Sequence, residues 1–333
     1  MPENEDTTRR ACRVLCVSGS RADKNYQRPV FEALEASDWA EAEYVGLGIH
    51  EDHNTHTPVT VATDMSRAMR EAARLLYSCE PDIVIVVGDR WEILAAVHAC
   101  TLAGVPVAHI AGGARTEGAY DDVFRRQIEV AAEIHFPLCE EDAGRLEYDI
   151  KVGRVGDAIH VSGSPALDLA AQSIRWLNKA RKGREGIFVA AYPETATGTN
   201  ISNSVGDAVF GFTEEVLWLS DNPDVGARTR GSSLPSEEYY RRLSTARVCV
   251  GNSSSFVLEA PFFGTPVVLV GDRQKGRHLC DNIIQVPNDP QAIREGVEKQ
   301  LAAGPYEPSS YWGSGDSAGK IAECIERWWE ARS

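Results

Sequence analysis

The 333-residue sequence lacks the features of a membrane, secreted or nucleic-acid-binding protein. It has no apolar run of about 18 residues, which a membrane-spanning helix needs. Its polar start, MPENEDTTRR, lacks the apolar stretch of a signal peptide. Acidic residues outnumber lysine and arginine by 49 to 34, and the formal charge of −15 disfavours nucleic acids and anionic membranes as partners. We therefore expect a cytoplasmic protein that binds neither nucleic acid nor membrane.

Cysteine occurs without the spacing of a metal or redox site. The eight cysteines are scattered, and the closest pair, Cys12 and Cys16, lies in CRVLC within an expected strand. Zinc sites and thioredoxin-like motifs require other spacings. We expect reduced, mostly buried cysteines, as in cytoplasmic proteins.

The chain alternates short apolar runs with stretches of helical periodicity. These runs predict strands at 13–20, 43–50, 82–89, 105–113, 186–193, 215–223, 247–255 and 265–273. Continuous apolar strands joined by helices are typical of parallel sheets covered on both faces. Because 333 residues exceed one hydrophobic core, the sequence predicts an α/β protein with two Rossmann-like, doubly wound domains facing a cleft.

The break between the two domains is expected near GSP at 163–165. We expect an N-terminal domain at 1–168, a C-terminal domain at 169–314 and an amphipathic final helix at 315–333. Ligands of doubly wound sheets bind beyond the carboxyl ends of the strands. Polar clusters at these ends are therefore candidate sites.

Two clusters follow strands of the first domain. Arg21 lies in SGSRAD, a turn of small residues that suits an anion but can also simply join a strand to a helix. Asp89 and Arg90 follow a buried strand in GDRWE. Burying two charges is costly, so they either have a chemical role or form an ion pair with each other.

A third cluster is the loop HIAGGARTEGAYDD, from His109 to Asp122. Thr116, Glu117, Asp121 and Asp122 are candidates for acid–base work. The alternative is a solvated helix start, because acidic residues favour the first helical turn.

The fourth cluster, at 250–282, is the most specific. Ser253, Ser254 and Ser255 can present hydroxyls and amides to a phosphate. Glu259, expected within a helix at 256–263, can accept two hydrogen bonds from a ribose diol. The segment GDRQKGR then adds three cations, Arg273, Lys275 and Arg277, that can bind a phosphate. The alternative is a solvated basic loop without a ligand.

These segments resemble the UDP-N-acetylglucosamine 2-epimerases, in particular the hydrolysing branch. The resemblance rests on GNSSS, EAPFFGTPVV, GDRQKGR, SGSRAD, GIHEDHNTHTP (48–58), GDRWEILAA, TEGAYDD and SGSPALD (162–168), in the family's order. It implies two Rossmann-like domains of the glycosyltransferase-B kind and a C-terminal helix that crosses back to the first domain. Trp328 and Trp329 suit that contact.

The family mechanism, as the resemblance implies it, removes the proton at sugar C2 while UDP departs, through a 2-acetamidoglucal. Water or UDP then adds back, and no metal or redox cofactor is needed. By the resemblance, Asp89 and Asp121 match catalytic carboxylates. The matched nucleotide-binding positions are Arg21, Ser253, Ser254, Ser255, Glu259 and Arg277.

Two catalytic positions depart from the family. Ala111 stands where many members carry glutamate, and Ala114 departs from the Gly-Gly-Glu that follows. Tyr192 stands where members carry histidine, and its ordinary pKa near 10 makes it a poor base. The connection at 221–231 is also shorter than usual.

We therefore expect an enzyme acting at C2 of a UDP-amino sugar, giving N-acetylmannosamine plus UDP or UDP-N-acetylmannosamine. The expected acid–base groups are Asp89, Asp121, Glu117 and either Tyr192 or His109, and Arg90 and Arg273 are expected to bind substrate. The alternatives are a glycosyl hydrolase or transferase on the same fold and a catalytically silent UDP-sugar-binding protein. A homodimer is expected.

Overall fold

The structure is a computed structural model that describes residues 10–19, 21–47, 58–117, 121–151, 158–177, 184–192, 200–219 and 234–332. Contacts between Cα atoms divide the chain into two compact units. Unit 1 contains Met1–Gly113, Phe124–Ser162 and Ser317–Ser333; unit 2 contains Ala114–Val123 and Gly163–Asp316. No helix of the described residues is both long and apolar enough to cross a membrane.

Unit 1 is built on a six-stranded parallel sheet of order β2-β1-β3-β4-β5-β6. Its strands are β1 (Cys12–Ser18), β2 (Ala40–Gly46), β3 (Ile83–Val87), β4 (Val107–Ile110), β5 (Ile134–Phe136) and β6 (Ala158–Ile159). The central strand β3 is buried along its whole length. Such continuous burial explains its unbroken apolar sequence, IVIVV.

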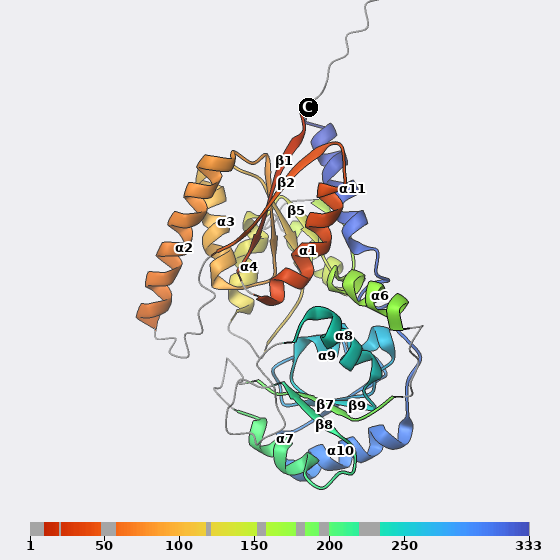
Figure 1. The fold of residues 1–333 in the computed structure, drawn as a ribbon. Coiled ribbons are helices and arrows are strands. Elements are labelled where there is room, and N and C mark those ends of the chain that lie inside the picture. Colours follow the sequence, from red (N-terminus) through yellow and green to blue (C-terminus); the bar gives the residue numbers. More distant parts are fainter. Residues whose placement is uncertain are drawn as a thin grey trace, which may run out of the picture. The chain divides into compact units, whose positions relative to one another are not determined.

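Helices cover both faces of this sheet (Figure 1). They are α1 (Arg21–Glu35), α2 (Pro58–Cys79), α3 (Trp91–Ala103), α4 (Asp122–Ala131), α5 (Glu140–Lys151) and α11 (Ser317–Glu330). Helices α2 and α3 pack together on one face and α1 packs beside α11 on the other. The final helix α11 is tied to unit 1 where the indole Nε1 of Trp328 donates to Glu133, 3.0 Å away.

Unit 2 has a five-stranded parallel sheet of order β11-β10-β9-β7-β8. Its strands are β7 (Ile187–Ala190), β8 (Val216–Leu219), β9 (Val248–Gly251), β10 (Val267–Val270) and β11 (Ile283–Val286). Its helices are α6 (Ala166–Leu177), α7 (Ser202–Val209), α8 (Ser236–Thr245), α9 (Ser254–Leu258), the 3₁₀ turn η1 (Ala260–Phe263) and α10 (Pro290–Ala303). Helices α7 and α10 cover one face, while α8 and α9 cover the other (Figure 1).

The predicted α/β class with two doubly wound domains is confirmed. Read in chain order, both sheets have the strand order 2-1-3-4-5, and unit 1 adds a sixth strand. All eight predicted strands are present, and the cysteines are free, with seven of eight buried. The strands β5 and β6 were not predicted, because two or three residues carry little periodicity. Strand β11 was not predicted either, because a glutamine interrupts its apolar run, IIQV.

One predicted helix is wrong. The helix expected at 256–263 is interrupted, because α9 ends at Leu258 and the 3₁₀ turn η1 begins at Ala260. Pro261 has no N–H and disfavours α conformation in the residue before it, so the α-helix cannot run through it. Glu259 therefore lies at the junction of two short turns instead of within a helix.

Candidate active site

The candidate groups lie at the carboxyl ends of the strands next to the topological switch point of each sheet, which we call its turning point. In unit 1 the order reverses between β1 and β3, and in unit 2 between β7 and β9. Doubly wound sheets bind ligands at this point because the connections leave it in opposite directions. Asp89 follows β3, and Tyr192 and Ser253 follow β7 and β9.

Asp89 is held by a buried arginine that the sequence analysis missed. Its carboxylate forms an ion pair with Arg125 of α4, whose side chain is only 3% exposed. Arg125 also donates to the carbonyl of Ala111, 2.7 Å away, so one guanidinium joins the ends of β3 and β4. The only sequence signal was a pair of adjacent arginines in FRRQI, which does not reveal which one is buried.

The alternative ion pair between Asp89 and Arg90 is wrong. Arg90 is the extended N-cap residue of α3, and its guanidinium turns forward onto Glu92 in the first helical turn, with 2.6 Å between Nη2 and Oε1. Glu92 is buried, so this pair stabilises the start of α3 and leaves Asp89 to Arg125.

His109 lies inside the sheet of unit 1. It is fully buried on β4, and its Nε2 lies 2.7 Å from the carbonyl oxygen of Gly88, next to Asp89. Burial lowers the pKa of His109 well below its ordinary value, so the ring is neutral and donates to that carbonyl. Its register partner on β5, His135, is also buried, which lowers its pKa to about 4. This position favours a supporting role for His109 over proton exchange with substrate.

The turn after β4 is fixed by α4. Ala111 has a positive φ of 66°, which is uncommon for a residue with a side chain. Its carbonyl accepts from Arg125, and the N–H of Gly113 donates to the carboxylate of Glu129, 2.6 Å away. Ala111, which the sequence resemblance matches to a glutamate position, is therefore a buried alanine, 8% exposed.

The next part of the loop belongs to unit 2. The N–H of Glu117 donates to the carbonyl of Lys275 at 3.0 Å, and the two side chains form an ion pair at 3.5 Å. The carboxylate of Asp122 accepts from the N–H of Thr116 at 3.0 Å. Asp121 lies in the turn just before α4, and residues 118–120 lie outside the described residues.

In unit 2 an asparagine joins the two strands at the turning point. The amide of Asn252 accepts from the N–H of Tyr192 at 2.9 Å and donates to its carbonyl at 2.8 Å. Gln274 in turn donates to the carbonyl of Asn252 at 3.0 Å. The ring of Tyr192 lies under Arg273, 5.5 Å from the guanidinium carbon. Predicted residues Tyr192 and Arg273 therefore come together, and Asn252 and Gln274 join them.

The three serines lie where α9 begins. Ser254 is exposed, Ser255 is buried, and the hydroxyls of Ser253 and Ser255 are 3.0 Å apart. Glu259 lies one turn further on. Its side chain is 6% exposed and has no hydrogen-bond or ion-pair partner among the described residues. Burial raises the pKa of Glu259 to about 8, which marks it as a carboxyl group without a protein partner.

Several predicted positions lie wholly or partly outside the described residues. Arg21 begins α1, but its side chain is not described. Residues 48–57, 193–199 and 221–231 also lie outside the described residues. In the described ranges, no group of three or more His, Cys, Asp or Glu residues could hold a metal ion.

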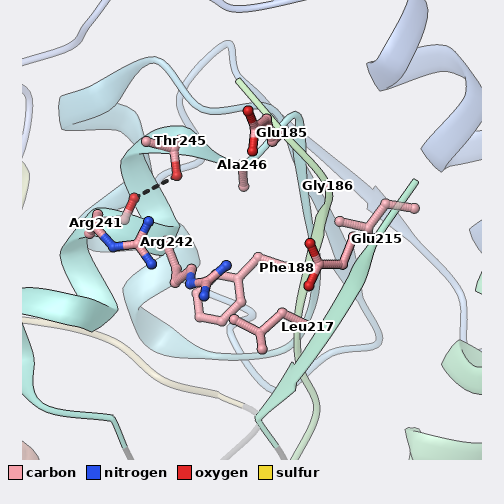
Figure 2. Close-up of a pocket in the computed structure, with 10 residues that line it drawn as sticks. Glu185, Gly186, Phe188, Glu215, Leu217, Arg241, Arg242, Thr245 and Ala246 are labelled. Carbon is pink, nitrogen blue, oxygen red and sulfur yellow. Dashed lines mark hydrogen bonds between the residues drawn. The ribbon is translucent and has the colours of Figure 1, made fainter. Parts of the chain in front are cut away.

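A pocket opens at the other end of the unit 2 sheet. Figure 2 shows Arg241 and Arg242 of α8 on one side and Glu215 on the other, above Phe188 and Leu217. These strand residues lie at the beginning of β7 and β8. The pocket is therefore separate from the carboxyl ends that carry the candidate groups.

Two doubly wound α/β units with polar groups at the turning points of their sheets are the architecture of the glycosyltransferase-B-like fold class. More particularly, the chain belongs to the UDP-N-acetylglucosamine 2-epimerase family, whose model matches residues 5–326. The resemblance predicted from the sequence motifs is thereby confirmed.

Relatives and solved structures agree with this assignment. A UDP-N-acetylglucosamine 2-epimerase of Neisseria meningitidis serogroup B is 26% identical over 94% of this chain and 94% of its own. A hydrolysing UDP-N,N'-diacetylbacillosamine 2-epimerase of Legionella pneumophila is 27% identical over 94% and 95%. The crystal structure of UDP-GlcNAc 2-epimerase from Neisseria meningitidis bound to UDP-GlcNAc has a TM-score of 0.77 and 17% identity, covering 95% and 100%. The structural similarity shows the shared fold.

Proposed function

We propose that this protein is a UDP-sugar 2-epimerase that acts at C2 of a UDP-amino sugar of the UDP-N-acetylglucosamine kind. Its products are N-acetylmannosamine plus UDP or, if UDP adds back, UDP-N-acetylmannosamine. The observation that carries the proposal is Asp89, held by buried Arg125 at the turning point of unit 1 in a chain of this family. A carboxylate in that position has the charge and the orientation of a general base.

The proposed reaction divides into proton transfer and departure of UDP. Asp89 removes the C2 proton, the C1–O bond to UDP breaks, and a 2-acetamidoglucal forms. Water or UDP then adds at C1 while an acid returns a proton to C2 from the opposite face, for which Asp121 is the candidate. The developing charge on the diphosphate requires hydrogen-bond donors and cations, here Ser253, Ser254, Ser255, Arg273 and Arg277.

Unit 2 supports the nucleotide part of the proposal. Buried Glu259 is a carboxyl group near the serines that has no partner among the described residues, and it suits a ribose diol. Tyr192 carries Arg273 on its ring, which favours placement of a cation over its use as a base. Glu117 is bound to Lys275 and is 57% exposed, which favours a role in holding the loop.

Water is proposed as the second substrate, as in the relatives named as hydrolysing. Ala111 has no group that transfers a proton, and Tyr192 is a poor base at its ordinary pKa near 10, so we assign proton transfer to Asp89 and Asp121. The reaction needs no metal or redox cofactor. The homodimer and the cytoplasmic location stay predictions, and light scattering in solution measures the first.

Incubation with UDP-N-acetylglucosamine in deuterated water, followed by proton NMR, tests the function. We expect a manno product with deuterium at C2. Free UDP without exchange at C2 would instead support a glycosyl hydrolase or transferase. Binding of UDP with the sugar intact would support a silent binding protein. Either of these two results would overturn the proposal.

A further inference from the structure

We propose that Tyr239 is a positioning residue of the nucleotide site in unit 2. Its hydroxyl fixes the hydroxyl of Ser255 and, through it, that of Ser253, so that a phosphate group meets donors in one arrangement. The inference rests on the proposed function, because it takes these two serines as diphosphate ligands.

The three hydroxyls form a continuous chain of hydrogen bonds. Tyr239 of α8 is hydrogen-bonded to Ser255, and the Ser255 hydroxyl lies 3.0 Å from that of Ser253. Tyr239 comes from a different element than the serines, which lie on the turn from β9 into α9. The contact therefore fixes side chains that their own short helix leaves free to rotate.

Aromatic packing holds the Tyr239 ring in place. Its edge meets Phe188 of β7, with 5.5 Å between ring centroids, and Tyr240 at 5.9 Å. Phe188 also contacts Phe256, the residue that follows Ser255, at 5.9 Å. Edge-to-face contacts of this kind fix ring orientation as well as burying area. The packing therefore fixes the Tyr239 ring, and with it the position of the hydroxyl that is hydrogen-bonded to Ser255.

The hydroxyl protons allow an arrangement in which the chain points donors at the ligand. Each hydroxyl has one proton to donate and two lone pairs to accept with. Burial raises the pKa of Tyr239 well above its ordinary value, and nearby Glu259 adds to the effect, so the phenol keeps its proton. When Tyr239 donates to Ser255, the Ser255 proton is released for Ser253 or for the ligand. Half-buried Ser253 can then donate outward, which suits an anionic acceptor.

The next residue supplies a matched control. Tyr240 is fully buried on the same helix, and its hydroxyl donates to the carbonyl of Ala166, 3.0 Å away. Tyr240→Phe removes one hydroxyl and its hydrogen bond to Ala166, and this hydrogen bond involves none of the three serines. The pair separates loss of a buried hydrogen bond from loss of the serine arrangement.

The experiment measures the Kd of UDP by calorimetry for the full chain and for Tyr239→Phe, Tyr240→Phe, Ser255→Ala and the double variant Tyr239→Phe/Ser255→Ala. Thermal unfolding of each variant sets a binding temperature at which all are folded. We expect Tyr239→Phe to weaken UDP binding about tenfold, the value of roughly one hydrogen bond. Tyr240→Phe is expected to leave the Kd of UDP within twofold of the wild-type value. It should lower Tm by about as much as Tyr239→Phe does.

The double variant shows whether Tyr239 acts through Ser255. We expect Tyr239→Phe to change the Kd less than twofold once Ser255 is alanine. Equal Kd values for Tyr239→Phe and wild type would overturn the inference, and so would fully additive losses in the double variant. In either case the proposed function still stands if the wild type binds UDP. Absence of UDP binding by wild type would overturn both. If Tyr239→Phe does not fold, Ser253→Ala, Ser255→Ala and their double variant still decide, because losses of UDP affinity that add in the double variant would contradict a connected chain.

Discussion

The two units share a strand order but differ in how they treat charge at the turning point. In unit 1 a carboxylate and a guanidinium neutralise each other there, Asp89 with Arg125. In unit 2 the two strand ends are joined by neutral amides, Asn252 and Gln274, and the buried acid Glu259 has no cationic partner among the described residues. The shared topology supplies the location, and the side chains at the strand ends decide the chemistry.

The same difference extends to buried titratable groups. Unit 1 buries two neutral histidines, His109 and His135, whose charged forms burial disfavours. Unit 2 buries the carboxyl group of Glu259, whose charged form burial also disfavours. A histidine becomes charged at low pH and a carboxyl group at high pH. The buried histidines should therefore destabilise unit 1 as pH falls, and buried Glu259 should destabilise unit 2 as pH rises.

Asp89→Asn should give the largest effect and tests whether unit 1 does the proton transfer. We expect kcat to fall about a hundred- to ten-thousand-fold, the range for losing a general base, while the Kd of UDP stays within threefold. Asp82→Asn is the matched control, since Asp82 lies just before β3 and pairs with Arg10 at 2.7 Å. Steady-state kinetics would contradict the division if both variants lost activity equally.

Glu259→Gln tests the alkaline side of the comparison. The pKa of Glu259 is raised from 4.5 to about 8, so the folded state binds a proton that the unfolded state has lost. Wild-type stability should therefore fall as pH rises from about 4.5 to 8, by up to about 5 kcal/mol at roughly 1.4 kcal/mol per pKa unit. Urea unfolding at pH 5 and pH 8 measures this. A pH dependence that the glutamine variant retains would contradict it.

His135→Phe tests the acid side. The pKa of His135 is lowered from 6.5 to about 4, so the unfolded state binds a proton that the folded state refuses. Stability should fall as pH drops from about 6.5 to 4, by up to about 3 kcal/mol, and the phenylalanine variant should lose less. Exposed His278→Gln serves as the control. If His135→Phe loses as much stability as wild type between pH 6.5 and 4, His135 does not contribute to that loss.

Asn252→Ala tests whether a neutral amide holds unit 2 together at its turning point. The change leaves the N–H and carbonyl of Tyr192 without their partner. We expect the free energy of unfolding to fall by about 2 kcal/mol and UDP binding to weaken with it. Exposed Gln285→Ala, which also removes a hydrogen bond, should cost about 0.5 kcal/mol or less. Equal losses in the two variants would deny Asn252 this role.

The strands and the family could be predicted from the sequence because both depend on short contiguous stretches of residues, the apolar runs and the motifs. The apolar runs locate β1, β3 and β9. Pairings between distant residues could not be predicted. Asp89 with Arg125 and Tyr239 with Ser255 meet only because crossovers bring separate elements to one edge of a sheet.

The most direct test follows deuterium at C2 of UDP-N-acetylglucosamine at saturating substrate in wild type, Asp89→Asn and Ser255→Ala. We predict that wild type exchanges and that Asp89→Asn does not, although it still binds UDP. Ser255→Ala should still exchange at saturation but with a weaker Kd for UDP. Exchange at the wild-type rate in Asp89→Asn would contradict the assignment of proton transfer to unit 1.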